Sequence, residues 1–479
     1  MNMKIKRSVI QICLPGVVLL QAATSVAQPV TKVAAGTYYS LFLKSDGSLW
    51  AMGNNSSGQL GDGTFNNTNR PEQIMASNIT AIAASDHSLF LKSDGSLWAM
   101  GNNVSGQLGD GTYSTNRPYY GTNQPEQIEA SNVTAIAAGD TFSLFLKSDG
   151  SLWAMGDNQY GQLGDGTYNC TNLPEQIEAS NVTAIAAGDT FSLFLKSDGS
   201  LWAMGDNYFG QLGDGTYNRT NLPEQIVASN VTASSAGEGH NLFLKNDGSL
   251  WAMGFNGYGQ LGDGTYNNTN LPEQIVASNV TAISAGANYS LFLKNDGSLW
   301  AMGDNNFGEL GDGTTPNWGF RSYTTTNLPE QIVAGNVTTI CGGSFTLMWS
   351  VGPGTPGEHS LFAKSDGSLW AMGDDIYGEL GDGTNYSVHS TFGPNRPEQI
   401  VAGPPGYNQI SAQLLSGGGV QLSFVGIAGA NYALDCSFSL APANWVPQVT
   451  NLAGTGGVLV FTNTPDPATN NFWRIRSVP

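Results

Sequence analysis

One near-identical segment recurs seven times along this chain of 479 residues, and the repetition constrains the fold more than any other feature. Each copy contains a variant of Leu-Phe-Leu-Lys-Ser-Asp-Gly-Ser-Leu-Trp-Ala-Met-Gly and continues into Gly-Gln/Glu-Leu-Gly-Asp-Gly-Thr and then Pro-Glu-Gln-Ile. The tryptophans of the copies are Trp50, Trp98, Trp153, Trp202, Trp251, Trp300 and Trp370. Such recurrence of one segment along a chain is typical of architectures in which each repeat packs only against its neighbours.

Each copy predicts a unit of about four short β-strands. Residues 41–44 and 48–52 are apolar runs joined by Ser-Asp-Gly, and a glycine at the end of such a turn favours a hairpin. Residues 183–187 illustrate a third run, and the segment around Pro-Glu-Gln-Ile supplies a fourth. The 62 glycines and the low charged fraction of 11% agree with an all-β fold.

The loop after each tryptophan strand carries a recognisable pattern. It reads Gly-x-Asn-x-x-Gly-Gln-Leu-Gly-x-Gly, as in residues 156–166 and 205–215, and it resembles the repeat of the regulator of chromosome condensation family. The resemblance covers residues 30–403 and implies a seven-bladed β-propeller, whereas the period alone would also allow a solenoid. Residues 30–36 match the segment that follows Pro-Glu-Gln-Ile elsewhere, so we expect them to lie beside residues 397–403 and close the ring.

Different sequences flank the repeats. Residues 1–27 read as a signal peptide, with Lys4, Lys6 and Arg7 before an apolar stretch, and we expect cleavage near Ala27 and a secreted or envelope-associated protein. That stretch is too short and too interrupted for a membrane anchor. Residues 406–479 predict a small C-terminal β-sandwich-like domain, similar to modules of secreted bacterial proteins.

Charge and composition argue against several functions. The net charge of −19 disfavours nucleic acid and anionic membranes as partners. Cys170, Cys341 and Cys436 form neither a paired framework nor a metal motif. The aspartates of Gly-Asp-Gly-Thr favour turn formation over calcium binding, so we expect no metal and no cofactor. These aspartates are Asp62, Asp110, Asp165, Asp214, Asp263, Asp312 and Asp382.

The repeats leave little room for a catalytic site. His87, His240 and His359 stand where other copies have Tyr or Phe, which indicates a packing position. Residues 125–158 and 174–207 are identical, whereas an active site needs different groups in unique places. We therefore predict a protein without catalytic residues.

Differences between the copies indicate a binding surface. The loop after Gly-Asp-Gly-Thr is longer in the second, sixth and seventh copies, which a propeller projects from one face as an arc. These loops hold residue types enriched at binding hot spots: Tyr119, Tyr120, Trp318, Phe320, Arg321, Tyr323 and Phe392. Weaker candidates precede Gly-Gln/Glu-Leu-Gly, where packing between blades is the alternative: Tyr160, Phe209, Tyr258, Phe307 and Tyr377.

The sequence as a whole favours a secreted, monomeric, non-enzymatic scaffold that binds a protein or a glycan through one propeller face. The resemblance implies an alternative, a guanine-nucleotide exchange factor for a small GTPase.

Overall fold

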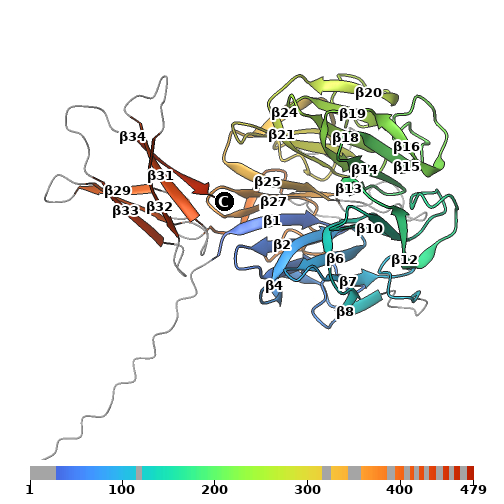
Figure 1. Ribbon diagram of the computed structural model, residues 1–479, viewed down its shortest axis with the longest axis horizontal. Helices are drawn as coiled ribbons and strands as arrows, with labels where there is room; N and C mark the ends of the chain where they lie inside the picture. Colours follow the sequence, from blue (N-terminus) through green and yellow to red (C-terminus); the bar gives the residue numbers. More distant parts are fainter. Residues whose placement is uncertain are drawn as a thin grey trace, which may run out of the picture.

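The computed structural model describes residues 28–114, 121–314, 325–343, 358–385 and 394–403, and six further strands between residues 410 and 478. The predicted signal peptide lies outside the described residues. Seven four-stranded antiparallel sheets form a ring, and the chain runs through them in order, from blue to orange in Figure 1. The prediction of an all-β, seven-bladed propeller is confirmed.

Each blade consists of four strands that are consecutive in the chain. Blade 1 contains β1 (Val30–Ala35), β2 (Tyr39–Lys44), β3 (Leu49–Gly53) and β4 (Thr68–Met75), and blade 2 contains β5 (Ile79–Ala84), β6 (His87–Lys92), β7 (Leu97–Asn102) and β8 (Gly121–Glu129). Blade 3 contains β9 (Val133–Ala138), β10 (Phe142–Lys147), β11 (Leu152–Gly156) and β12 (Thr171–Glu178), and blade 4 contains β13 (Val182–Ala187), β14 (Phe191–Lys196), β15 (Leu201–Gly205) and β16 (Thr220–Val227).

The remaining blades follow the same plan. Blade 5 contains β17 (Val231–Ala236), β18 (His240–Lys245), β19 (Leu250–Gly254) and β20 (Thr269–Val276), and blade 6 contains β21 (Val280–Ala285), β22 (Tyr289–Lys294), β23 (Leu299–Asp304) and β24 (Thr325–Val333). Blade 7 contains β25 (Val337–Gly342), β26 (His359–Lys364), β27 (Leu369–Gly373) and β28 (Glu398–Val401).

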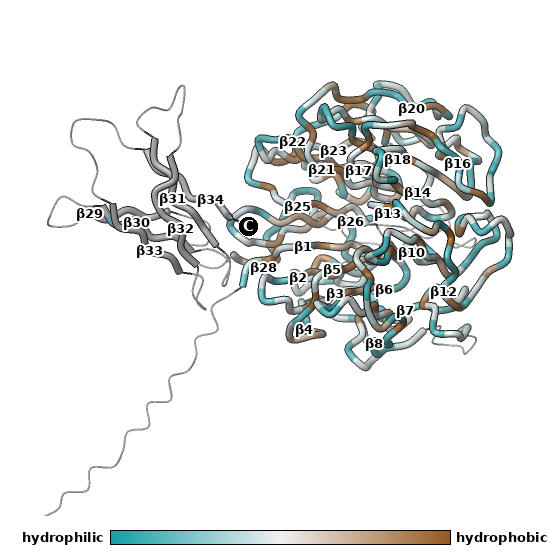
Figure 2. The backbone as a smooth tube through the Cα atoms, viewed as in Figure 1, coloured by the Kyte–Doolittle hydropathy of each residue, from teal (hydrophilic) through white to brown (hydrophobic). Residues whose placement is uncertain are grey.

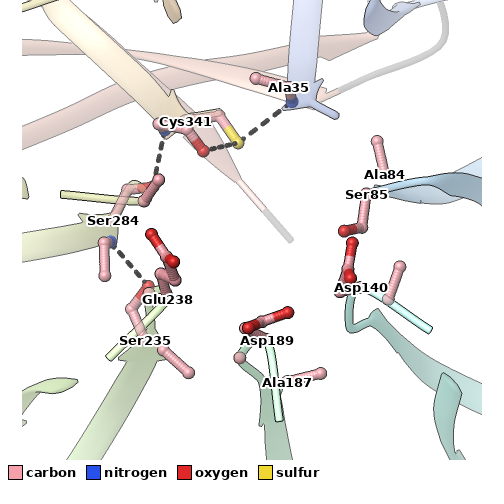
Figure 3. A pocket seen from close by; sticks show the side chains of 17 residues that line it. Ala35, Ala84, Ser85, Asp140, Ala187, Asp189, Ser235, Glu238, Ser284 and Cys341 are labelled. Atoms are coloured by element: carbon pink, nitrogen blue, oxygen red, sulfur yellow. Dashed lines mark hydrogen bonds between the residues drawn. The ribbon is translucent and has the colours of Figure 1, made fainter. Parts of the chain in front are cut away.

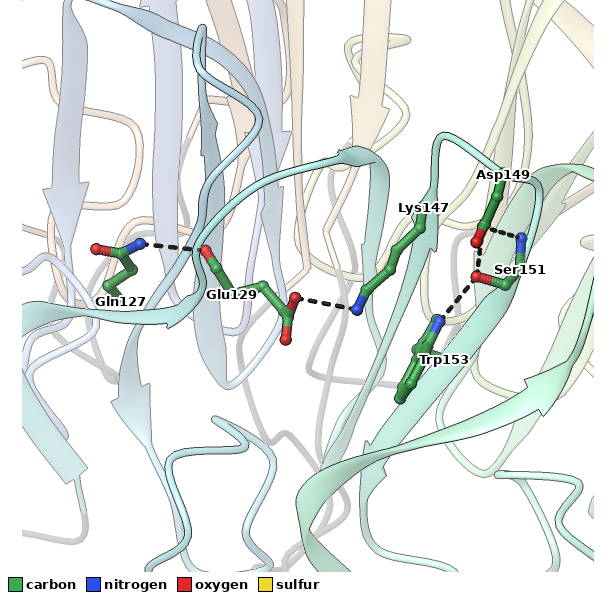
Figure 4. A network of polar contacts seen from close by, with 6 residues as sticks. All are labelled: Gln127, Glu129, Lys147, Asp149, Ser151 and Trp153. Atoms are coloured by element: carbon green, nitrogen blue, oxygen red, sulfur yellow. Dashed lines mark hydrogen bonds and ion pairs between the residues drawn. The ribbon is translucent and has the colours of Figure 1, made fainter.

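The hairpin between the second and third strands is held by its own turn residues, as blade 3 shows (Figure 4). Gly150 takes a φ of 79°, and the carboxylate of Asp149 accepts a hydrogen bond from the Ser151 amide at 2.9 Å. The Ser151 hydroxyl in turn accepts the indole N–H of Trp153 at 2.9 Å. The Lys147 ammonium lies 4.2 Å from the centre of the Trp153 ring, which adds a cation–π contact.

The second turn motif, Gly-Asp-Gly-Thr, is also explained by local hydrogen bonds. In blade 3, Asp165 accepts the amide of Thr167 at 2.7 Å and the side-chain amide of Asn158 at 3.0 Å. The interpretation of these aspartates as turn formers is confirmed.

The hydrophobic core runs between the blades. The second strand of each blade is buried except at its final lysine, whereas every residue of the fourth strand is at least partly exposed, and hydrophobic segments recur along the inner strands in Figure 2. One of seven clusters joins Leu144 and Leu163 of blade 3 to Phe194 and Met204 of blade 4. Gly164 is required there, because a Cβ atom would lie 2.6 Å from the Met204 sulfur.

The first and last blades close the ring through the same kind of contact. Val30, Phe42 and Met52 of blade 1 share a cluster with residues of blade 7, and Ile400 and Val401 pack against it. The Val30 amide donates a hydrogen bond to the Gly367 carbonyl at 3.0 Å. Residues 30–36 and 397–403 therefore contribute to one seam, as the sequence predicts.

The C-terminal part of the chain forms two three-stranded sheets. One contains β29 (Ile410–Leu414), β30 (Val420–Val425) and β33 (Val458–Asn463), and the other contains β32 (Val446–Leu452), β31 (Asn431–Ser437) and β34 (Phe472–Val478). The packing of these sheets as a sandwich stays a prediction. Within the described part of the chain, no helix has the length and apolar character needed to cross a bilayer.

Candidate functional site

One face of the propeller gathers the groups that differ between blades. Because each blade is an antiparallel sheet of consecutive strands, the loops after its first and third strands emerge at the same end. The first-strand loops surround the mouth of the central channel, and the third-strand loops surround that mouth at a larger radius. We call this surface the loop face.

A cavity of about 160 Å³ opens at the channel mouth on the loop face (Figure 3). It is lined by small residues at the ends of the innermost strands, such as Ala35, Ala187 and Ser235, which leave the centre open. This volume admits water, ions or a single side chain and is below the size of usual small-molecule sites.

Carboxyl groups project into this cavity from three consecutive blades, as Figure 3 shows for Asp140, Asp189 and Glu238. Burial raises the pKa of Asp189 to about 6, and the negative charges of Asp86, Asp206 and Asp157 act in the same direction. The hydrogen bond of Asp189 to Asp140 acts in the opposite direction and lowers this pKa. Burial and the charge of Asp189 raise the pKa of Glu238 to about 7. The mouth is thus a strongly acidic and partly protonated site.

A second acidic group lies beside the mouth, at the seam between blades 6 and 7. Asp304, Glu309 and Glu358 are buried, and each offers a carboxylate oxygen within 4.8 Å of the other two. The side-chain amide of Asn288 donates to Glu358 at 3.0 Å and to Glu238 at 3.3 Å, which connects the seam to the channel mouth. Burial, reinforced for Glu309 and Glu358 by the neighbouring carboxylates, raises the pKa of all three carboxyls, and that of Asp304 reaches about 7.

The opposite face of the ring carries one lysine and one turn aspartate in each blade, such as Lys147 and Asp149. Seven lysines at the ends of the second strands lie over the repeat tryptophans, with ammonium-to-ring distances of 3.6 to 4.2 Å. Within the described residues, lysines beside turn aspartates therefore gather on one face and buried carboxyls on the other.

The predicted binding residues of the long loops lie outside the described residues. These are Tyr119, Tyr120, Trp318, Phe320, Arg321, Tyr323 and Phe392. The described residues on either side, such as Ser114 and Gly121 in blade 2, belong to the loop face.

The five weaker candidates all occupy the third-strand loops, and all except Phe307 are partly exposed. Tyr377 contacts Tyr38 of the next blade edge to face, with ring centres 5.0 Å apart, and Phe209 contacts Phe255 of the next blade at 4.6 Å. Tyr160 is 38% exposed beneath the Arg219 guanidinium, Tyr258 packs on Phe255, and Phe307 is buried. The contacts of Tyr377, Phe209 and Tyr160 join neighbouring blades, whereas the contact of Tyr258 lies within blade 5.

The three repeat histidines are structural, as predicted. His87, His240 and His359 are fully buried, and each contacts a serine hydroxyl of the next blade at 2.6 to 2.9 Å. Burial lowers the pKa of His87 and His240 to about 3, so both imidazoles stay neutral.

Comparison with protein families identifies the propeller. An RCC1-like domain model matches residues 10–281, more than half of the chain, and a model of the regulator of chromosome condensation (RCC1) repeat matches residues 280–309. The chain belongs to the RCC1-like family. Its blades therefore follow the RCC1-like pattern, in agreement with the resemblance of the repeats.

Solved RCC1-like propellers share the fold of this chain. Human WBSCR16 is 23% identical with a TM-score of 0.60, and the match covers 70% of this chain and 87% of that one. Prp20p from Saccharomyces cerevisiae is 23% identical with a TM-score of 0.55, covering 66% and 80%. Yeast RCC1 (Prp20), from a complex with Kap60, gives 19% identity and a TM-score of 0.63, covering 86% and 93%.

Sequence reasoning did not find the two acidic groups. The signal for the second is an exchange inside the repeat: Gly-Gln-Leu-Gly becomes Gly-Glu-Leu-Gly at Glu309 and Glu379. A glutamate at a position where five copies have glutamine could have indicated that an additional carboxyl group lies in these two blades.

Proposed function

We propose that this chain is a secreted, non-enzymatic interaction scaffold that binds a protein or a glycan through its loop face. The observation that carries the proposal is the asymmetry of the ring. Loops of variable length, half-exposed aromatic side chains and buried carboxyls belong to the loop face, whereas seven near-identical lysine–tryptophan hairpins form the other. Binding surfaces are built from loops that vary on a rigid scaffold.

The chemistry of the loop face favours a partner with positively charged or hydroxyl-rich groups. Carboxylates around the channel mouth attract cations, and aromatic rings such as Tyr160 provide flat surfaces for sugar rings or hydrophobic side chains. The small volume of the cavity supports recognition of a surface rather than enclosure of a substrate.

Export is part of the proposal. It is supported by the basic and then apolar pattern of residues 1–27 and by the small residues before Gln28. N-terminal sequencing of protein from the medium or envelope should find Gln28 or a nearby residue at the mature end. Recovery of the intact N-terminus from the cytoplasm would contradict this part of the proposal.

The second candidate is guanine-nucleotide exchange on a small GTPase. It is favoured by membership of the RCC1-like family, and the Prp20p structure is described together with binding to Gsp1p and histones. Release of labelled GDP from a purified GTPase of the source organism, with and without this protein, tests it directly. Acceleration by more than about tenfold would favour exchange over the scaffold proposal.

The test of the binding face uses the mature protein on a glycan array and in chemical cross-linking at the cell surface. Alanine at Tyr120 or Trp318 should weaken capture of the identified partner by at least about tenfold, because a hot-spot side chain contributes about 2 kcal/mol or more. Alanine at Gln127, on the exposed fourth strand of blade 2, is the matched control and should leave capture unchanged. A sharp fall in Tm with unchanged capture would instead make Tyr120 and Trp318 packing residues.

A further inference from the structure

Blades 3 and 4 show how the repeat normally satisfies the aspartate that follows the third strand. The side-chain amide of Gln162 donates to Asp157 at 3.2 Å, and Gln211 donates to Asp206 at 3.1 Å. The carbonyl oxygen of Gln162 accepts the backbone amide of Tyr160 at 3.0 Å. Both ends of the glutamine are therefore paired, and the buried carboxylate has a donor.

Blade 6 has the same backbone arrangement but a glutamate in place of the glutamine. Oε2 of Glu309 accepts the amide of Phe307 at 2.8 Å, as the glutamine oxygen does in blade 3. Oε1 of Glu309 therefore takes the place of the amide nitrogen and faces Asp304. It is buried without a hydrogen-bond partner, since a carboxylate oxygen has no hydrogen to donate to a second carboxylate.

Blade 7 adds a third carboxylate to this pair. Glu358 is 4% exposed; its Oε1 accepts the Asn288 amide at 3.0 Å, and its Oε2 has no partner. The two ion pairs found among the described residues, Lys147–Glu129 and Lys196–Glu178, lie in other blades. A buried carboxylate cluster without a balancing cation is strongly unfavourable.

We propose that Asp304, Glu309 and Glu358 bind one divalent cation of the calcium type at the seam between blades 6 and 7. Two oxygens that bind one calcium ion at 2.3 to 2.6 Å lie at most about 5 Å apart, and the three carboxylates here meet that limit at 4.8 Å. The donors are all carboxylate oxygens, which suit a hard cation such as calcium better than zinc or copper, whose sites usually include nitrogen or sulfur ligands. The unpartnered oxygens of Glu309 and Glu358 are the first ligands.

The site would join two blades that carry long loops. Asp304 ends β23 of blade 6, Glu309 lies in the loop that follows it, and Glu358 directly precedes β26 of blade 7. The ion would therefore fix the seam between blades 6 and 7, whose third-strand loops are two of the three longer ones in the sequence. This role does not depend on the proposed partner.

The test titrates calcium chloride into the full-length mature protein, stripped with a chelator, and follows heat of binding and Tm. The wild type should bind one equivalent and melt several degrees higher with calcium at about 100 times its Kd. Glu309→Gln restores the amide of the other blades and should weaken binding on the order of 100-fold or abolish it. In chelator, this variant should melt at or above the wild type.

Glu379→Gln is the matched control, because it makes the same exchange one blade further on. Glu379 accepts the Tyr377 amide at 2.7 Å just as Glu309 accepts that of Phe307, yet no described third carboxylate completes a cluster there. This variant should keep calcium binding. If Glu309→Gln fails to fold, Glu358→Gln replaces it with the same expectation.

Two results would overturn the proposal. A wild-type protein that shows neither binding heat nor a Tm shift with calcium would mean that protons alone neutralise the cluster. Calcium binding that persists in both Glu309→Gln and Glu358→Gln would place the ion elsewhere.

Discussion

The side chain at the tip of the first-strand loop decides the electrostatics of the channel mouth. Blades 3, 4 and 5 place Asp140, Asp189 and Glu238 there, whereas blades 1 and 6 have Thr37 and Ala287. The acidic character is therefore concentrated on one side of the channel. It depends on single residues in an otherwise repetitive ring.

The raised pKa of Glu238 makes stability depend on pH. Its pKa is about 7 in the folded protein and near 4.5 when exposed, so the folded state binds the proton more tightly. The free energy of unfolding should therefore fall as pH rises from about 4 to about 7. Asp189 and Asp304, whose pKa values are also raised, contribute to the same fall. Glu238→Gln should therefore reduce the fall, stabilising the protein at pH 8 by roughly 1–3 kcal/mol with little effect at pH 4.

Urea unfolding at pH 4, 6 and 8 measures this effect. Glu175→Gln, on the exposed fourth strand of blade 3, is the control for loss of a surface carboxylate. Equal stabilisation by Glu238→Gln at all three pH values would show that Glu238 is not the titrating group.

At the scale of strands, a serine or asparagine at the start of each second strand fastens one blade to the preceding one. Ser192 of β14 donates to the Gln162 carbonyl of blade 3 at 2.7 Å, and Ser143 of β10 donates to the Gln107 carbonyl of blade 2 at 2.7 Å. Ser143 additionally contacts the His87 imidazole at 2.6 Å. The number of polar groups that this serine contacts therefore depends on the first residue of the second strand in the preceding blade. That residue is His87 for Ser143 and Phe142 for Ser192.

Alanine at these two serines should therefore have unequal effects. Ser192→Ala leaves one buried carbonyl without its donor and should cost about 1–2 kcal/mol, whereas Ser143→Ala also removes the partner of His87 and should cost about 1 kcal/mol more. Chemical denaturation of the two variants compares the costs. An equal or reversed order would show that the His87 contact adds no stability.

The hairpins could be predicted from the sequence because their partners are close in the chain. Asp149 and Ser151 are two residues apart, and their turn forms in every copy. The pair of Ser40 and His359 could not be predicted, because 319 residues separate them and only ring closure brings them together. The sequence also did not reveal that Glu309 lies near Glu358, because the two residues belong to neighbouring blades.

At the scale of the whole molecule, the closing seam repeats the packing of the internal seams. Met52 of blade 1 packs on Gly381 and Leu380 of blade 7, as Met204 of blade 4 packs on Gly164 and Leu163 of blade 3. A closed ring makes these two seams energetically equivalent. An open array would leave Met52 at an exposed end.

Met52→Ala and Met204→Ala should therefore destabilise the protein equally, each by about 2–5 kcal/mol. Differential scanning calorimetry of the two variants gives the comparison. A negligible effect of Met52→Ala beside a large effect of Met204→Ala would indicate that the ring is open in solution.

The seven-bladed ring was predictable because it follows from the number of repeats and from a family resemblance. Of the candidate site, only the position of the variable loops was predictable. Strand direction alone places the variable loops on the loop face, and binding through that face stays a prediction. The acidic groups there arise from residues of different blades, such as Asp140 with Asp189, and their proximity depends on the curvature of the ring.

The consecutive order of strands within each blade also determines how the molecule bears mechanical load. Among the described residues, no strand from one end of the propeller completes a sheet at the other end, so blades 1 and 7 are joined by side-chain packing and by isolated hydrogen bonds such as Val30 to Gly367. A strand ladder pulled in shear must lose several backbone hydrogen bonds together, whereas packed surfaces can separate without breaking any sheet. Tension between residues 30 and 401 would therefore part the ring at this seam first, and every blade would remain intact.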